Sequence, residues 1–196
     1  RSEYTTSENR AAGITEANRA RLMLLHAQFR GPFTVEDAVA ALEFDVERTR
    51  RFLAYLASRG WLSRVQSGVY IVVPLDATRP AEWREDPWLV GARIFAPCYI
   101  GGWSACEHWG LTEQIFREIQ VVTSRKVRHR HPVIQGTQFH VTVRSASLLF
   151  GTRVVWRRDL QVMVSEPTRT VVDVLDDPAL GGGMRHVAEI VHAYFT

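Results

Sequence analysis

Among the side chains that can bind metal ions, a group of histidines and a cysteine in the second half of the chain is considered first for its spacing. His129 and His131 are separated by one residue, whereas Cys106 lies well before them in the chain and His140 lies after them. A protein zinc site is usually built from two pairs of closely spaced ligands, and no second pair is found here. The pattern therefore predicts no metal site.

Motifs of nucleophilic, phosphate-binding and nuclease chemistry are also incomplete. Ser104 is followed by His108, but the Gly-x-Ser-x-Gly turn that presents a nucleophilic serine is missing. The glycines at 181–183 lack the Lys-Ser/Thr pair of a phosphate-binding loop. Asp159 and Glu166 bracket a predicted strand with no lysine between them. We therefore expect a protein that is not an enzyme, with no catalytic residue and no cofactor.

Arginine points to a different kind of chemistry. The chain of 196 residues has 24 basic and 21 acidic side chains, and Lys126 is the one lysine. Genome base composition explains most of this preference, but the planar guanidinium also suits phosphate and guanine contacts. The apolar fraction of 46% is typical of a folded protein, and apolar runs stay far below the roughly 18 residues of a membrane helix. With only two cysteines, we expect a reduced, cytoplasmic protein with no membrane partner.

Residues 14–74 have the element order of a winged helix-turn-helix domain. Three helices are predicted, and each begins after a residue that can cap it: Thr15, Thr34 and Asp45. Two β-prone runs at 61–65 and 69–73 follow, joined by a Gln-Ser-Gly turn. A hairpin placed directly after the third helix is the wing of this class of fold.

The third helix has the two faces of a DNA-recognition helix. At about 100° per residue, the apolar side chains between Thr49 and Leu56 share an inward face, and the arginines lie opposite. Recognition helices read base edges with their N-terminal half, so Arg48 and Arg51 are expected to contact guanine or phosphate. Thr34 is expected to offer a free hydroxyl to a phosphate at a helix N-terminus. The complete set of expected DNA-binding residues is Thr34, Arg48, Arg50, Arg51, Tyr55, Arg64, Gln66 and Ser67.

The same domain also fits a protein-interaction module. Winged helices serve that role too, and arginines on an exposed helix are also typical of a solvated surface. Residues 1–74 carry ten basic and eight acidic side chains, a net charge of +2 that is low for DNA binding. A dimer would offset part of this weakness, because each neutralised phosphate adds to the binding.

Composition divides the rest of the chain. Residues 1–13 are polar without periodicity and predict a flexible tail, while the proline-rich and acidic segment 75–87 predicts a linker. Residues 88–196 predict a second domain, so the expected fold class is α+β, with an N-terminal winged helix-turn-helix followed by a mixed α+β domain. Its expected helices are 87–95, 103–109, 167–176 and 184–195, and its expected strands are 98–100, 117–123, 126–134, 137–143 and 153–164.

Positive charge is concentrated in the segment 124–158, which has eight basic side chains and no acidic one. Alternation along the expected strand would place Lys126, Arg128 and Arg130 on one face. Such a face is typical of a solvated sheet or of a surface that holds the DNA backbone. It is also typical of a surface that binds RNA or an acidic partner, and the sequence leaves these alternatives open. The residues of this second basic surface are Arg125, Lys126, Arg128, Arg130, Arg144, Arg153, Arg157 and Arg158.

Two motifs in the second domain resemble a known family. They are Tyr99-x-Gly-Gly-Trp-Ser-Ala-x-x-His-Trp-Gly-Leu-Thr-Glu-Gln114 and Glu166-Pro-Thr-Arg-Thr-Val-Val-Asp-Val-Leu175. With the preceding winged helix, they are similar to the AbiEi antitoxins, and the likeness extends over residues 15–196. Cys106 stands where the family often has an aliphatic residue, and Thr168 where it usually has glutamate. Neither departure lies in the DNA-reading helix.

The resemblance implies a function that composition and spacing do not provide. It implies a winged helix that binds inverted repeats of double-stranded promoter DNA and represses its own toxin–antitoxin operon in bacteria, at the nucleoid. It also implies an antitoxin domain acting against a nucleotidyltransferase-like toxin, with or without direct contact, and a homodimer or cooperative assembly on DNA. Family chains generally continue with further helices, so we expect a chain truncated at its C-terminus.

Overall fold

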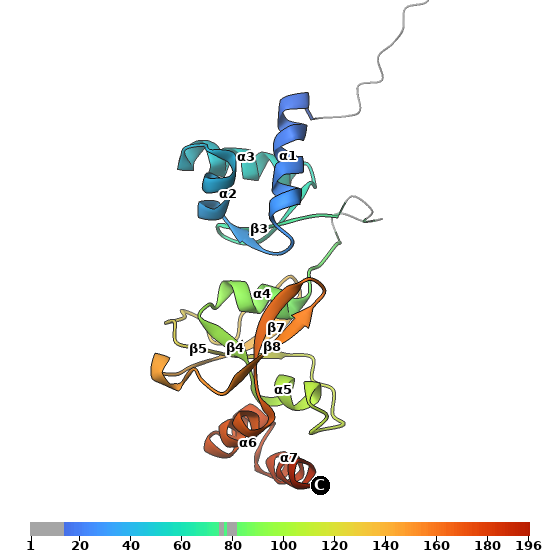
Figure 1. The fold of residues 1–196 in the computed structure, drawn as a ribbon, viewed down its shortest axis with the longest axis vertical. Helices are drawn as coiled ribbons and strands as arrows, with labels where there is room; N and C mark the ends of the chain where they lie inside the picture. Colours follow the sequence, from blue (N-terminus) through green and yellow to red (C-terminus); the bar gives the residue numbers. More distant parts are fainter. Residues whose placement is uncertain (1–13, 75–76, 78–81) are drawn as a thin grey trace, which may run out of the picture.

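The computed structural model describes residues 14–74, 77 and 82–196 (Figure 1). The expected tail at 1–13 and most of the expected linker lie outside these residues. The first part of the chain contains α1 (Glu16–Gln28), β1 (Phe33–Thr34), α2 (Val35–Leu42), α3 (Val46–Ser58), β2 (Leu62–Gln66) and β3 (Val69–Val72). This order of helices and hairpin confirms the winged helix-turn-helix.

The three helices begin at the residues whose side chains predict them. The side chains of Thr15, Thr34 and Asp45 each accept a hydrogen bond from a backbone N–H three residues along the chain. At α2 the Asp37 carboxylate also accepts the backbone N–H of Thr34 at 2.7 Å, which completes a capping box. Capping therefore fixes where each helix starts.

The hairpin that forms the wing is covered on both faces. The three-stranded sheet has the order β1-β3-β2, and all four residues of β3 are buried. Tyr70 and Val72 pack with the three helices, whereas Val69, Ile71 and Val65 pack into the core of the second part of the chain. Figure 1 shows the sheet between the helices and that second part. The wing is thus also an internal packing element.

The second part is built on a six-stranded mixed sheet. Its elements are α4 (Pro87–Ile94), β4 (Cys98–Ile100), α5 (Gly102–His108), β5 (Ile119–Thr123), β6 (Val133–Ile134), β7 (Thr137–Val143), η1 (Ala146–Leu148), β8 (Thr152–Arg157), β9 (Leu160–Ser165), α6 (Pro167–Asp176), η2 (Pro178–Gly181) and α7 (Met184–Phe195). The strand order is β6-β7-β5-β4-β9-β8, with parallel pairs β5–β7 and β4–β9. This mixed architecture confirms the α+β fold class.

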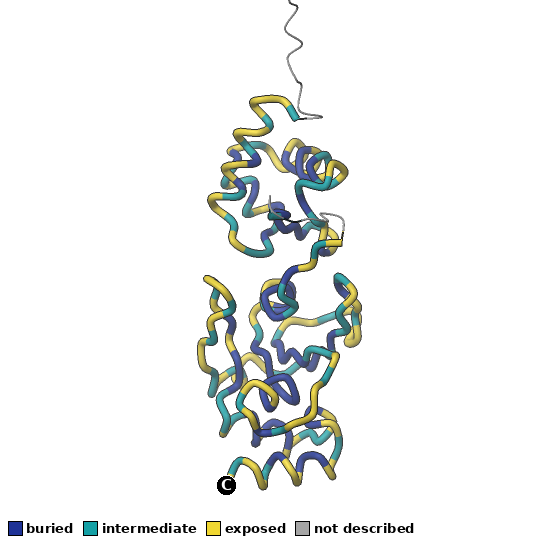
Figure 2. Tube along the Cα trace, turned by 90° about the vertical axis from the view of Figure 1, so that its right-hand side faces the viewer, coloured by how far each residue is buried: buried dark blue, intermediate teal, exposed yellow. Residues whose placement is uncertain are grey.

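Helices cover the sheet in two groups. Helix α4 packs between the sheet and the hairpin of the winged helix, with Trp88, Leu89 and Val90 buried. Helices α5, α6 and α7 form a separate cluster around Cys106, at the end of the molecule far from the winged helix (Figure 1). In Figure 2 the inner strands are buried, whereas α7 alternates between buried and exposed turns. The pattern of α7 is that of a surface helix with one apolar face.

Two of the expected strands are wrong. Residues 126–132 form a loop, and only Val133–Ile134 of the expected strand 126–134 pairs as β6. A run of basic residues ending at Pro132 has too few apolar side chains to cover a sheet face, so alternation does not apply there. The expected strand 153–164 is a hairpin of β8 and β9, which turns at Arg158 with φ of 54°. Asp159 follows it in place of the glycine that usually marks such a turn.

Polar contacts also connect the winged helix to the second part. The guanidinium of Arg93 at the end of α4 forms an ion pair with Asp37 of α2. The side chain of Gln135, in the turn between β6 and β7, donates to the hydroxyl of Ser63 at 3.1 Å and accepts the backbone N–H of Glu85 at 3.2 Å. We propose the division into residues 14–74 and 88–196, with Glu85 and Asp86 at the end of the linker bound to residues of the second part.

Candidate nucleic-acid interface

The recognition helix α3 presents its arginines outward. Thr49, Phe52, Leu53 and Leu56 are buried, so this face of the helix is fixed against the core. Arg48 and Arg51 lie on the opposite face and are exposed. Figure 1 shows α3 on the side of the winged helix away from the second part of the chain. The face is therefore accessible to a large partner such as DNA.

A hollow of about 370 Å³ lies between α1 and α3. Arginine and aromatic side chains dominate its lining, which consists of Asn18, Arg21, Phe44, Arg48, Arg51, Phe52 and Tyr55. Asn18, Arg21 and Phe44 are not among the residues that the sequence singled out. Arg21 lies nearly two helical turns from the cap of α1 and belongs to no motif, so charge alone could have drawn attention to it.

The other expected contacts on α3 already have neighbours within the helix. Arg50 forms an ion pair of 2.9 Å with Glu47, and both side chains are largely exposed. Tyr55 is half-buried, and the guanidinium of Arg59 lies 5.8 Å from the centre of its ring. A role of either residue in DNA binding stays a prediction.

The free hydroxyl expected at Thr34 is wrong. Thr34 Oγ1 donates to the Asp37 carboxylate at 2.9 Å and accepts the backbone N–H of Asp37 at 3.2 Å. Burial opposes ionisation of Asp37, but the Thr34 N–H and Arg93 outweigh it and hold the pKa of that carboxyl below its ordinary value. A phosphate at Thr34 would meet this negative charge, so Thr34 functions as a helix cap.

The wing residues remain on the surface. Arg64, Gln66 and Ser67 are exposed, although Val65 between them is buried against the second part of the chain. The Arg64 guanidinium donates a long hydrogen bond of 3.4 Å to the Ser67 hydroxyl. The tip of the hairpin is therefore free to approach DNA, and its contact with DNA stays a prediction.

The eight residues of the second basic surface do not form one surface. Arg144 pairs with Asp176 at 3.0 Å and Arg153 with Glu166 at 3.6 Å. Arg157 and Arg158, in the hairpin of β8 and β9, pair with Asp86 at 2.8 Å and Glu85 at 2.9 Å. Acids from outside the segment 124–158 thus pair with these four arginines, which favours a paired, solvated surface over a DNA-binding face for them.

The other four basic residues lie together in the loop 124–132. Arg125, Lys126, Arg128 and Arg130 are all exposed. The Arg125 guanidinium donates to the carbonyl of Ile94 at 3.1 Å, at the end of α4. Just beyond the loop, Gln135 bonds to the hairpin of the winged helix. Both ends of the loop are therefore anchored near the winged helix, and the loop keeps its positive charge exposed.

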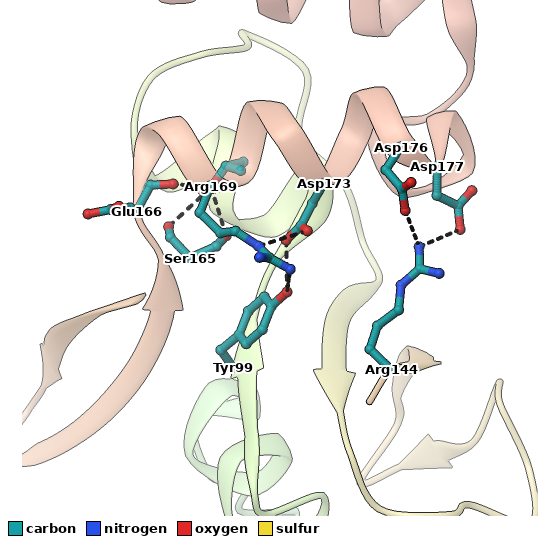
Figure 3. A network of polar contacts seen from close by, with 9 residues as sticks. Tyr99, Arg144, Ser165, Glu166, Arg169, Asp173, Asp176 and Asp177 are labelled. Atoms are coloured by element: carbon teal, nitrogen blue, oxygen red, sulfur yellow. Dashed lines mark hydrogen bonds and ion pairs between the residues drawn. The ribbon is translucent and has the colours of Figure 1, made fainter. Parts of the chain in front are cut away.

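The two sequence motifs of the second part meet in a buried polar network (Figure 3). Tyr99 of β4 donates to Asp173 of α6 at 2.8 Å, and Arg169 lies 2.9 Å from the same carboxylate. Burial and the neighbouring Asp173 raise the pKa of the Tyr99 phenol, so it stays protonated and donates. Trp109 Nε1 also donates to the carbonyl of Ser165 at 2.7 Å. These residues position α6 against the sheet.

The second part has no arrangement that indicates catalysis in the residues described. Burial raises the pKa of Cys106 to about 12, so its thiol is unreactive near neutral pH. No group of three or more metal-binding side chains occurs within the ranges 14–74 and 82–196. Within the same ranges, no helix has the length and apolar character needed to cross a bilayer.

A helix-turn-helix with a following hairpin and an arginine-bearing third helix defines a winged-helix domain, a fold that is common among DNA-binding proteins. Residues 20–73 match a family model described as "Transcriptional regulator, AbiEi antitoxin". This match confirms the AbiEi resemblance over the winged-helix part of the chain. The motifs of the second part lie outside the matched residues.

The fold also resembles a solved structure, the RV2827C protein from Mycobacterium tuberculosis. The TM-score is 0.57 at 19% sequence identity, and the likeness covers 86% of this chain. This chain spans 64% of the length of that one. The likeness therefore extends into the second part and concerns the fold alone. No curated protein matches this chain.

Proposed function

We propose that this protein is a sequence-specific DNA-binding antitoxin that represses its own toxin–antitoxin operon. The observation that carries the proposal is the outward face of α3, on which Arg48 and Arg51 are exposed while the opposite face is buried. Arginine forks in the N-terminal half of a recognition helix suit bidentate contacts to guanine or phosphate. The expected ligand is double-stranded promoter DNA with inverted repeats.

The wing and the basic loop extend this interface in our proposal. Arg64, Gln66 and Ser67 at the hairpin tip would contact the minor groove or the backbone, and the loop 124–132 would hold backbone phosphates beyond them. Phosphate contacts carry little sequence information but contribute much of the affinity. They would compensate for the winged helix, whose own net charge is only slightly positive. A homodimer or cooperative binding to paired sites would add to this effect.

The antitoxin role is proposed for the second part of the chain. The network around Tyr99, which joins the two sequence motifs of this part, supports a folded scaffold. The toxin is proposed to be a nucleotidyltransferase encoded beside the antitoxin, in a cytoplasmic system. This proposal does not require the second part to bind the toxin, because an antitoxin can also counteract a toxin without direct contact.

The alternative is a toxin-neutralising interaction module that does not use its winged helix on DNA. The low net charge of the first 74 residues and the Arg50–Glu47 pair favour this alternative. Gel-shift titration with the region upstream of the gene, against an unrelated duplex of equal length, separates the two. Preferential binding, together with repression of a reporter driven by that region, supports the first. Equal binding to both duplexes without repression supports the alternative.

A further inference from the structure

We propose that the hollow between α1 and α3 binds a backbone phosphate of DNA. In this site Arg21 contacts the phosphate, and Phe44 positions the guanidinium of Arg48. This proposal rests on the proposed function and deepens it, because it adds a residue of α1 and a residue of the helix-turn-helix turn to the interface.

Phe44 is the centre of the arrangement. Its ring lies in the turn between α2 and α3, and the Cζ atom of Arg48 is 3.9 Å from the ring centre. The Cζ atom of Arg21 lies 5.0 Å from the same centre. Phe44 also makes an edge contact with the buried Phe52, with ring centres 6.1 Å apart. The core therefore holds the ring in place, and the ring holds two long side chains that would otherwise sample many rotamers.

The charges around the ring are unbalanced. Two guanidinium groups approach one aromatic ring, and Arg51 adds a third positive charge to the lining of the hollow. In the ranges 14–74 and 82–196, no carboxylate forms an ion pair with Arg21, Arg48 or Arg51. The nearest acid in sequence, Glu47, is paired with Arg50 instead. Like charges gathered in this way repel, and an anion bound between them would remove the repulsion.

The position of the hollow favours a phosphate of the DNA backbone as that anion. The hollow borders the exposed face of α3, so a strand that flanks the groove entered by α3 would pass close to it in our proposal. Guanidinium groups stacked on a ring keep their N–H donors directed outward in the plane, which matches the oxygen atoms of a phosphate. Asn18, whose side-chain oxygen accepts from Arg21 at 3.4 Å, further restricts that arginine.

The test is a salt series of equilibrium binding with the full chain and its upstream duplex. The variant R21A is compared with R19A, which removes an exposed arginine of α1 outside the hollow. We expect R21A to weaken binding and to reduce the slope of log K against log salt by about 0.9, the change for one phosphate contact. R19A is expected to leave the slope unchanged. Equal slopes for the two variants would overturn the phosphate contact of Arg21.

The positioning role of Phe44 has a separate readout. F44L keeps apolar volume in the turn but removes the ring face, and F44Y retains it. We expect F44L to weaken DNA binding without a loss of thermal stability, whereas F44Y should bind DNA as the wild type does. In an R48A background, F44L should have no further effect on DNA binding. An equal effect of F44L with and without Arg48 would overturn the role. If the wild type does not prefer its upstream duplex, the proposed function fails, whereas the R21A comparison still tests the hollow on any duplex at low salt.

Discussion

Arg93 and Asp37 form an ion pair that joins the end of α4 to the capping box at the start of α2. One carboxylate thus stabilises a helix of the winged domain and also holds the second part of the chain against it. The three-stranded sheet, whose hairpin is the wing, lies between the two parts. The orientation of the winged helix is therefore set by contacts with the second part of the chain as well as by packing within the helix-turn-helix itself.

Replacement of Asp37 tests this connection. The lowered pKa of Asp37 means that its stabilising effect is present above the ordinary value of 3.8 and is lost as the pH falls through its value in the folded protein. We expect D37N to lower the free energy of unfolding by about 1 kcal/mol at neutral pH, from the weakened cap and ion pair. Urea unfolding of both proteins across a pH series measures this difference in the free energy of unfolding. The exposed neighbour variant E36Q should have little effect, and equal stability of D37N and wild type at neutral pH would refute the connection.

The polar network around Asp173 gives a second prediction. Asp173 and Arg169 are each about one tenth exposed, so D173N leaves a buried guanidinium without its partner. We expect a loss of about 3 to 5 kcal/mol in the free energy of unfolding. Y99F removes one hydrogen bond and should cost about 1 kcal/mol. The control is D176N, whose carboxylate is 69% exposed and whose partner Arg144 keeps Asp177 (Figure 3). A D173N effect no larger than that of D176N would contradict a structural role for the network.

The raised pKa of Glu85 predicts a change of stability with pH that is opposite in sign to that of Asp37. Burial raises its pKa above the ordinary 4.5, although the Asp86 N–H and Arg158 act against this effect. A raised pKa in the folded state means that the stability contributed by Glu85 is complete below 4.5 and is lost as the pH rises through the folded value. We therefore expect wild type to lose stability relative to E85Q between pH 4.5 and neutral pH. Chemical unfolding of both proteins at several pH values checks this, and a constant difference would show that Glu85 is not the titrating group.

The basic loop 124–132 gives a prediction that concerns DNA directly. Arg125, Lys126, Arg128 and Arg130 are exposed, whereas the arginines at 144, 153, 157 and 158 are paired with acids. Changing the first four to alanine together should weaken binding to specific and unrelated duplexes alike, and should lower the salt slope by about 0.9 for each phosphate that the loop neutralises. The exposed Arg185 of α7, at the far end of the molecule, provides the control R185A. An unchanged slope in the fourfold variant would exclude the loop from the interface.

Local signals in the sequence were sufficient for the winged helix and for the inner elements of the second part. Caps at Thr15, Thr34 and Asp45 and the apolar face of α3 depend on residues within one or two turns of each other. Such patterns can be interpreted without knowing the tertiary structure. The pair of Arg169 and Asp173 is local in the same sense, because the two residues are one turn apart on a helix.

The failures arose where distant residues decide the outcome. The Thr34 hydroxyl is hydrogen-bonded to Asp37 within the capping box. Asp37 in turn forms an ion pair with Arg93, which belongs to the second part of the chain. Four arginines of the second basic surface pair with acids from other segments, and two of these acids, Glu85 and Asp86, belonged to the expected linker. The hollow between α1 and α3 combines a helix and a turn that are far apart in the sequence. No local pattern contains these contacts.

The measurement that tests the central claim most directly compares two double variants in DNA binding. R48A/R51A removes the two exposed arginines of the recognition helix, and R19A/R185A removes the same charge elsewhere on the surface. Both should fold as the wild type does, which circular dichroism and thermal unfolding verify. We predict that R48A/R51A loses the preference for the upstream duplex over an unrelated one, since each base contact contributes about 1 to 3 kcal/mol of discrimination. The control should retain that preference, and an unchanged preference in R48A/R51A would contradict the assignment of α3 as the recognition helix.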